Sequence, residues 1–92
     1  MNKNYDYFLT IVKMGSLTRA ADALYITQSS LSKYLSRLEA DLNIQLFDRS
    51  CSPMVLTYAG HLYLEYVNRL LSMDSRLQAE FDEVRSETRG ET

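Results

Sequence analysis

One amphipathic segment, residues 28–42, constrains the fold more than any other feature of this 92-residue chain. Four leucines recur in it at spacings of four, three and four, so they lie on one face of an α-helix. They are Leu31, Leu35, Leu38 and Leu42. Thr27 precedes the segment as an N-cap, and Asn43 follows it as a residue that tolerates the left-handed conformation. The sequence therefore predicts a helix over residues 28–42 with a buried leucine face.

Two shorter helices are predicted before this segment. The first runs from about residue 4 to residue 14, since four apolar residues share one helical face. These are Tyr5, Phe8, Leu9 and Val12. Gly15 ends that helix, because glycine adopts the left-handed cap conformation without steric cost. The second covers residues 18–24, where Ala20 and Ala21 allow another helix to approach closely. Three residues then join it to the segment at 28–42, which is a helix-turn-helix arrangement.

The chain after residue 43 predicts a small hairpin and one long helix. Leu46-Phe47 and Val55-Leu56 are short strand-like runs around the turn-rich Ser50-Cys51-Ser52-Pro53. Thr57 is placed to cap a helix that reaches Val84 or beyond. The fold is therefore mainly α, with three short helices, a hairpin and a long C-terminal helix.

The long helix carries an apolar stripe that the small head cannot cover alone. A strict heptad path through Tyr63 and Val67 brings in Asp74, so we favour a path that is apolar throughout and avoids burying a charge. Its members are Leu62, Tyr66, Leu70, Met73, Leu77, Phe81 and Val84. We expect this stripe to pack on the same helix of a second chain. The alternative is a helix folded wholly onto its own domain.

Length and composition fit a single domain of 92 residues with 46% apolar content. No run of residues is long and apolar enough for a membrane span, and the N-terminus has no signal-peptide pattern. A single cysteine, Cys51, indicates the reducing cytoplasm. Residues 1–60 carry six Lys and Arg against five Asp and Glu, whereas residues 61–92 carry four against seven. The head is therefore nearly neutral, which permits DNA binding without demanding it.

The outer face of the 28–42 helix has the chemistry of a DNA-reading helix. Gln28, Ser29, Ser32 and Lys33 lie within its first two turns. Small residues there let the backbone approach bases in the major groove, glutamine can pair with adenine, and lysine can pair with guanine. Arg37 lies one turn further along and suits a backbone phosphate. The alternative is an ordinary solvated face on a helical dimerisation or protein-interaction module that does not bind DNA.

The order of these residues resembles the signature of LysR-type transcriptional regulators. The matching stretch is Gly15-Ser16-Leu17-Thr18-x-Ala20-Ala21-x-x-Leu24-x-Ile26-Thr27-Gln28-x-Ser30-Leu31-Ser32-x-x-Leu35-x-x-Leu38-Glu39. It continues as Leu42-x-x-x-Leu46-Phe47-x-Arg49 and Leu56-Thr57-x-Ala59-Gly60, so the resemblance covers residues 5–60. The resemblance implies a winged helix-turn-helix that binds interrupted palindromic promoter sites as a dimer, with the long helices paired antiparallel.

The resemblance also implies site residues and domain bounds. The 28–42 helix enters the major groove, and Arg49 starts a wing that reaches the minor groove or its phosphates. The predicted DNA-contacting set, which also includes tyrosine and hydroxyl residues near that surface, is Thr18, Arg19, Thr27, Gln28, Ser29, Ser30, Ser32, Lys33, Tyr34, Arg37, Arg49 and Ser50. We expect a DNA-binding domain at 1–58, a linker and dimerisation helix at 59–88 and a frayed tail at 89–92. We expect this chain to lack the family's effector-binding domain, so a small-molecule inducer is expected only where that domain is present.

The sequence departs from the family pattern in three ways. Ser29 replaces a common proline, and Asn43 replaces a common glycine. The family's wing commonly carries further basic residues after the arginine, whereas here Ser52, Pro53, Met54 and Val55 follow. Fewer phosphate contacts make the salt dependence of DNA binding shallower.

No enzyme is indicated. The sequence offers no carboxylate pair, nucleophile–base set or glycine-rich phosphate loop, and we expect no cofactor or metal. His61 stands alone and reads as a surface or packing residue, and Cys51 reads as an incidental small residue of the wing turn.

Overall fold

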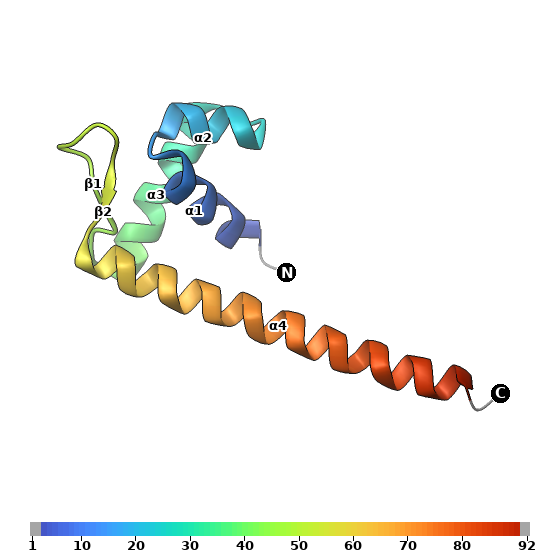
Figure 1. Cartoon of the computed structure of the whole chain (residues 1–92). Helices are drawn as coiled ribbons and strands as arrows, with labels where there is room; N and C mark the ends of the chain where they lie inside the picture. Colours follow the sequence, from blue (N-terminus) through green and yellow to red (C-terminus); the bar gives the residue numbers. More distant parts are fainter. Residues whose placement is uncertain (1–2, 91–92) are drawn as a thin grey trace.

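The computed structural model describes residues 3–90, with side-chain surroundings for residues 5–87. Figure 1 shows a small helical head, a hairpin beside it and one long helix that extends away from both. In chain order the elements are α1 (Lys3–Met14), α2 (Leu17–Leu24), α3 (Gln28–Leu42), β1 (Phe47–Asp48), β2 (Val55–Leu56) and α4 (Tyr58–Gly90). The predicted mainly helical architecture is confirmed, and the first three helices begin within one residue of the expected positions.

Short caps fix the connections between the first three helices. Ser16 accepts a hydrogen bond from the Arg19 amide at the start of α2, and Gly15 before it has φ +68°. Tyr25 and Asn43 end α2 and α3 in the left-handed conformation, with φ of 58° and 56°. Gly15 and Asn43 were the predicted helix ends. Tyr25 is a bulky residue in a conformation that L-amino acids with large side chains seldom adopt.

The hairpin is a two-stranded antiparallel sheet in which Phe47 pairs with Leu56 and Asp48 pairs with Val55. The amide of Met54 donates to the carbonyl oxygen of Gly15 at 2.9 Å, so β2 is attached to the turn between α1 and α2. One side of the hairpin therefore rests on the helical head while its turn projects away from it (Figure 1).

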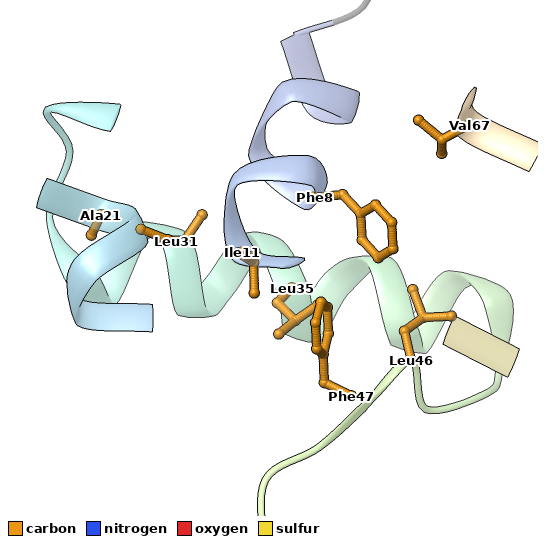
Figure 2. Close-up of a cluster of buried hydrophobic side chains, with 9 residues drawn as sticks. Phe8, Ile11, Ala21, Leu31, Leu35, Leu46, Phe47 and Val67 are labelled. Carbon is orange, nitrogen blue, oxygen red and sulfur yellow. The ribbon is translucent and has the colours of Figure 1, made fainter. Parts of the chain in front are cut away.

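The core joins all of these elements around the end of α1. In Figure 2 Phe8 projects from α1 toward Phe47 and Leu46, and Val67 reaches the cluster from α4. The Phe8 ring lies 5.6 Å from the Phe47 ring and 4.8 Å from the Tyr63 ring, between centroids. The buried apolar residues are Phe8, Ile11, Ala20, Ala21, Leu31, Leu35, Leu46, Phe47 and Val67. Burial of both alanines allows α2 to pack closely, as expected from the sequence.

The core differs from the sequence-based prediction at two residues, Leu42 and Val67. Leu42 is 43% exposed, although it continues the leucine face of α3, because the last turn of that helix extends beyond the core. Val67 is fully buried in the same cluster as Phe8, so the first turns of α4 pack with the head although they lie past the expected boundary at residue 58.

Beyond these turns α4 leaves the head. Residues 72–87 are exposed without exception, and the molecule measures 60 × 27 × 21 Å along its principal axes. The helix continues through Gly90, so the first part of the predicted tail at 89–92 is helical, and residues 91 and 92 lie outside the described residues. In the part of the chain that the structure describes, no helix combines the length and the apolar character needed to cross a membrane.

Candidate nucleic-acid interface

The outer face of α3 is open to solvent along its first three turns. Leu31 and Leu35 are buried on the opposite side of this helix, which fixes its rotation on the head. Two predicted reading residues, Gln28 and Lys33, are therefore exposed, and Ser32 is half-buried. The other exposed residues of this face are Ser29, Ser36 and Arg37. The helix presents amide, hydroxyl and basic groups together, as base edges in the major groove require.

The N-terminus of α3 is ordered by hydroxyl groups. Thr27 Oγ1 accepts from the Ser30 amide at 3.1 Å and lies 2.8 Å from Ser30 Oγ and 3.3 Å from Ser29 Oγ. Thr18 Oγ1, from α2, donates to Gln28 Oε1 at 3.0 Å. Five predicted contact residues thus lie at one end of the helix, where unpaired backbone amides attract a phosphate.

The remaining α2 residue of the predicted set, Arg19, is exposed one position after Thr18. Its backbone amide completes the α2 N-cap with Ser16, so the start of α2 is fixed by the same kind of hydroxyl contact as the start of α3. The exposed cation of Arg19 therefore projects from an ordered helix end.

Tyr34 differs from the other predicted contact residues, because its ring packs inward. It lies edge to face with Tyr7 of α1, with 5.3 Å between ring centroids. Burial raises the pKa of Tyr34 far above the ordinary tyrosine value, and the charges of Tyr63 and Tyr5 act in the same direction. Tyr34 also lines a cleft of about 430 Å³ whose rim includes Lys33 and Arg37. The ring therefore belongs to the flank of α3 rather than to its outer face.

The wing carries the last two predicted contact residues, Arg49 and Ser50. Ser50 donates from both its amide and its hydroxyl to Asp48 Oδ1, at 3.0 and 2.6 Å, and these bonds lower the pKa of the Asp48 carboxyl. Cys51 follows in the same turn as an exposed free thiol. The candidate interface therefore draws on two elements, the outer face of α3 and the hairpin wing.

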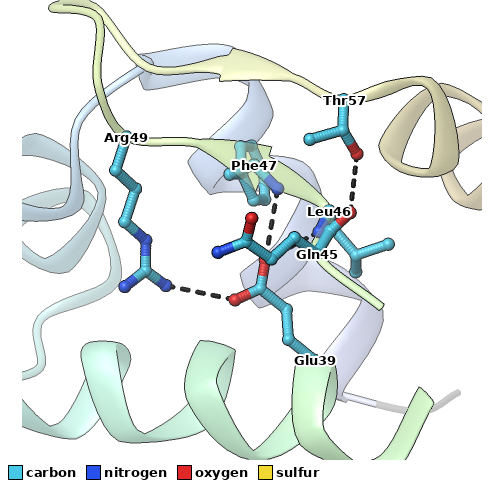
Figure 3. A network of polar contacts seen from close by, with 6 residues as sticks. All are labelled: Glu39, Gln45, Leu46, Phe47, Arg49 and Thr57. Atoms are coloured by element: carbon cyan, nitrogen blue, oxygen red, sulfur yellow. Dashed lines mark hydrogen bonds and ion pairs between the residues drawn. The ribbon is translucent and has the colours of Figure 1, made fainter. Parts of the chain in front are cut away.

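Glu39, which is not among the predicted contact residues, connects α3 to the wing. Its carboxylate lies at the base of the wing and accepts hydrogen bonds from the backbone amides of Leu46 and Phe47 (Figure 3). The other carboxylate oxygen lies 3.4 Å from Nη2 of Arg49. One signal could have revealed it: Glu39 follows Leu35 by four residues, so a carboxylate lies directly beside the buried face of α3.

Six of the seven residues of the predicted dimerisation stripe of α4 are exposed. Exposed fractions are 50% for Leu62, 51% for Tyr66, 67% for Met73 and 47% for Leu77. Phe81 and Val84 are 45% and 59% exposed, and Leu70 is intermediate. The neighbouring face of α4, with Tyr63 and Val67, packs on the head instead. The fold therefore uses one face of the helix for its own core and leaves the adjacent apolar face in solvent.

Comparison with known proteins places this arrangement in a family. The family model described as bacterial regulatory helix-turn-helix protein, lysR family, matches residues 3–61. The probable RuBisCO transcriptional regulator of Gracilaria tenuistipitata var. liui is 49% identical over 63 residues, which are 68% of this chain and 20% of that protein. The chain thus spans about a fifth of the length of this curated relative.

Two solved structures share the fold. The complex of the BenM DBD with catB site 1 DNA has a TM-score of 0.81 at 34% identity and covers 94% of each chain. Full-length CbnR complexed with its target DNA has a TM-score of 0.73 at 32% identity and covers 87% of this chain and 28% of that chain. The fold and the exposed outer face of α3 assign this chain to the class of winged helix-turn-helix proteins. The chain belongs to the LysR family of bacterial regulatory helix-turn-helix proteins.

Proposed function

We propose that this chain is the DNA-binding domain of a transcriptional regulator, and that it binds a two-fold symmetric promoter site as a homodimer. The observation that carries the proposal is the likeness to the BenM DBD in its DNA complex, which extends over 94% of both chains. The exposed amide, hydroxyl and basic groups of α3 supply the chemistry that such a complex needs. Its place of action is the nucleoid in the bacterial cytoplasm, and its role is regulatory rather than enzymatic.

Base contacts belong to the first two turns of α3. Gln28, Ser29, Ser32 and Lys33 lie on its open side and carry no large apolar group that would keep the helix out of a groove. Gln28 Oε1 accepts one bond from Thr18, so the amide nitrogen and the second lone pair of that oxygen are the groups that it offers to a base. We assign sequence preference to these four residues.

We assign phosphate contacts to residues at the N-terminal end of α3, at the start of α2, further along α3 and in the wing. The helix end at Thr27 and Ser30 supplies amides and hydroxyls, and the cations of Arg19, Arg37 and Arg49 supply charge. Ser50 accompanies Arg49 in the wing, and Tyr34 contributes by packing the flank of α3 on which Lys33 and Arg37 stand.

The exposed stripe of α4 is the dimer interface. Six exposed apolar residues and the half-buried Leu70 form an apolar face at helical spacing, which is unfavourable in solvent unless a partner covers it. A second copy of the same helix is a self-complementary partner under two-fold symmetry. Two heads joined in this way can contact two half-sites at once, so dimerisation raises affinity without new base contacts.

In vitro selection of bound duplexes tests the proposal. Incubation of the chain with a random-sequence duplex pool and sequencing of the bound fraction should recover an inverted repeat. A salt titration with a random duplex gives the second readout. Three phosphate-facing cations per protomer predict that log affinity falls with log salt at a slope of about −3 per protomer.

The outcomes separate DNA binding from a protein-interaction role. Recovery of an inverted repeat together with a salt-dependent affinity supports a sequence-specific regulator. If no duplex binds even at low salt while sedimentation still reports a dimer, the chain is a dimerisation module and the proposed function is wrong.

A further inference from the structure

The carboxylate of Glu39 joins the recognition helix α3 to the base of the wing. Its Oε2 atom accepts from the Leu46 amide at 2.7 Å and from the Phe47 amide at 3.2 Å. The side chain is only 12% exposed, so both bonds are largely shielded from water. Two consecutive backbone amides, one just before β1 and one at its first residue, therefore fix one carboxylate oxygen relative to the wing.

Fixing one oxygen of a planar carboxylate also fixes the other. Oε1 of Glu39 lies 3.4 Å from Nη2 of Arg49, and the Arg49 side chain is 41% exposed (Figure 3). The guanidinium is thus paired on one side and open to solvent on the other. A planar guanidinium has five N–H donors, so an arginine paired in this way can still donate to a phosphate.

The base of the wing has a second attachment that does not involve Glu39. Thr57 Oγ1 donates to the Gln45 carbonyl oxygen at 2.6 Å, and the Thr57 amide donates to the Leu46 carbonyl oxygen at 3.0 Å. Phe47 and Leu46 are also buried in the core. These contacts keep the strand in place, so the contribution specific to Glu39 is the direction of the Arg49 side chain.

We propose that Glu39 is a positioning residue for DNA binding: its carboxylate directs Arg49 and thereby sets the distance between the wing cation and the outer face of α3. This proposal rests on the proposed function, because only DNA binding supplies a phosphate that Arg49 can contact. A long arginine side chain loses conformational entropy when it is ordered. Glu39 orders it before DNA arrives, so the ordering cost does not reduce the affinity.

Glu39→Gln tests the proposal with a matched control. The variant retains an oxygen that can accept from the Leu46 amide but loses the ion pair with Arg49. Asp41→Asn removes the same charge from the same helix, and Asp41 lines the cleft near Arg37 on the other flank. Both variants change net charge equally, so their comparison isolates the effect of the carboxylate position. Each is made in the natural and in the Arg49→Ala background.

The affinity of each variant for one selected duplex is measured by fluorescence anisotropy at several salt concentrations. The temperature is kept below the thermal unfolding midpoint of every variant. Glu39→Gln should bind about fivefold more weakly than Asp41→Asn, within the range of coupling between contacting residues. Its salt slope should be less steep by up to about 1, because one phosphate contact is lost. In the Arg49→Ala background both differences should disappear. A purely structural role would change the thermal midpoint but not the slope.

Several results would overturn the proposal. Tighter binding by Glu39→Gln than by Asp41→Asn would show that Glu39 restrains Arg49 from DNA. An equal loss in the two backgrounds would place the effect in the fold rather than in Arg49. If the unaltered chain binds no duplex, the proposed function fails first, and this inference fails with it. If Glu39→Gln does not fold, Glu39→Asp replaces it, since this variant keeps the charge but shortens the reach to Arg49.

Discussion

Gly60 and Leu46 lie close together where α4 begins: a Cβ on residue 60 would clash with the carbonyl oxygen of Leu46. That oxygen accepts a hydrogen bond from the Thr57 amide at 3.0 Å, so it cannot move aside freely. The Gly60 amide donates to Thr57 Oγ1 at 3.0 Å, which completes the N-cap of α4. These contacts set the angle at which α4 leaves the head.

Gly60→Ala should therefore destabilise the chain. The added methyl group meets backbone rather than a flexible side chain, so we expect a loss of about 3 kcal/mol in the free energy of unfolding. Urea denaturation followed by circular dichroism measures it. Ser75→Ala, on the exposed part of α4, is the control and should change stability by less than about 0.5 kcal/mol. Equal urea midpoints for the two variants would contradict the close contact.

Tyr25→Gly should stabilise the chain. Tyr25 has φ 58° and is 95% exposed, so its side chain gains little from packing while its backbone is in the left-handed region. Glycine relieves that strain but has a higher conformational entropy in the unfolded chain. The net effect should be an increase of about 0.5–1 kcal/mol in the free energy of unfolding. Thermal unfolding measures it. Asn43→Gly is the matched control at φ 56°, where asparagine is already tolerated and the gain should be smaller. A lower midpoint for Tyr25→Gly would show that the exposed ring supports the fold.

Helix periodicity was sufficient to predict most of the fold. The leucine spacing in α3 and the glycine and asparagine stops gave the first three helices, because these signals are local. Val67 could not be assigned to the head from its spacing, since it belonged equally to a heptad seam. Leu42 was expected to be buried but is exposed, because periodicity identifies the apolar face of a helix but not where the core beneath that face ends.

The candidate site was predicted unevenly for the same reason. Exposed residues of α3 follow from the position of its buried face, so Gln28 and Lys33 were placed from the sequence. Glu39 was missed because its partners are backbone amides of a segment that the helix pattern does not locate. Tyr34 was expected near the DNA surface, whereas its ring packs on Tyr7, a contact between helices that single-helix periodicity cannot reveal.

Stability should decline in alkaline solution, with Tyr34 as a main cause. Burial raises the pKa of Tyr34 above the ordinary value of 10.0, and the pKa values of Tyr5 and Tyr63 are raised as well. The folded state therefore favours the neutral phenol. Its contribution is complete below about pH 10 and is lost as the pH rises further, because the unfolded chain releases its protons first. The midpoint of urea denaturation should fall as the pH rises from 8 to 11. The Tyr34→Phe variant should show a smaller fall in this midpoint per pH unit. A slope that Tyr34→Phe leaves unchanged would refute this assignment.

Leu77→Asp should convert the proposed dimer into a monomer. Leu77 is 47% exposed near the middle of the α4 stripe, where a partner would bury it, and an unpaired carboxylate there is costly. We expect the dimer dissociation constant to rise at least about 100-fold, which corresponds to roughly 2.7 kcal/mol. Sedimentation equilibrium measures it. Gln78→Asp adds the same charge next to the stripe and should leave the dimer intact. A dimer that survives Leu77→Asp would place the interface elsewhere.

Lys33→Ala and Arg49→Ala should weaken DNA binding in different ways. Lys33 is exposed on the open face of α3, so its removal should cost about tenfold in affinity and relax preference at one base position. Arg49 belongs to the wing, and we assign it a phosphate contact, so its removal should weaken binding to all duplexes about equally and make the salt slope less steep by about 1. Arg76→Ala removes the same charge from the exposed part of α4 and is the control for net charge. In vitro selection with each variant, together with salt titrations, distinguishes the two roles. Identical specificity profiles for Lys33→Ala and Arg49→Ala would show that the division between base contact on α3 and phosphate contact in the wing is wrong.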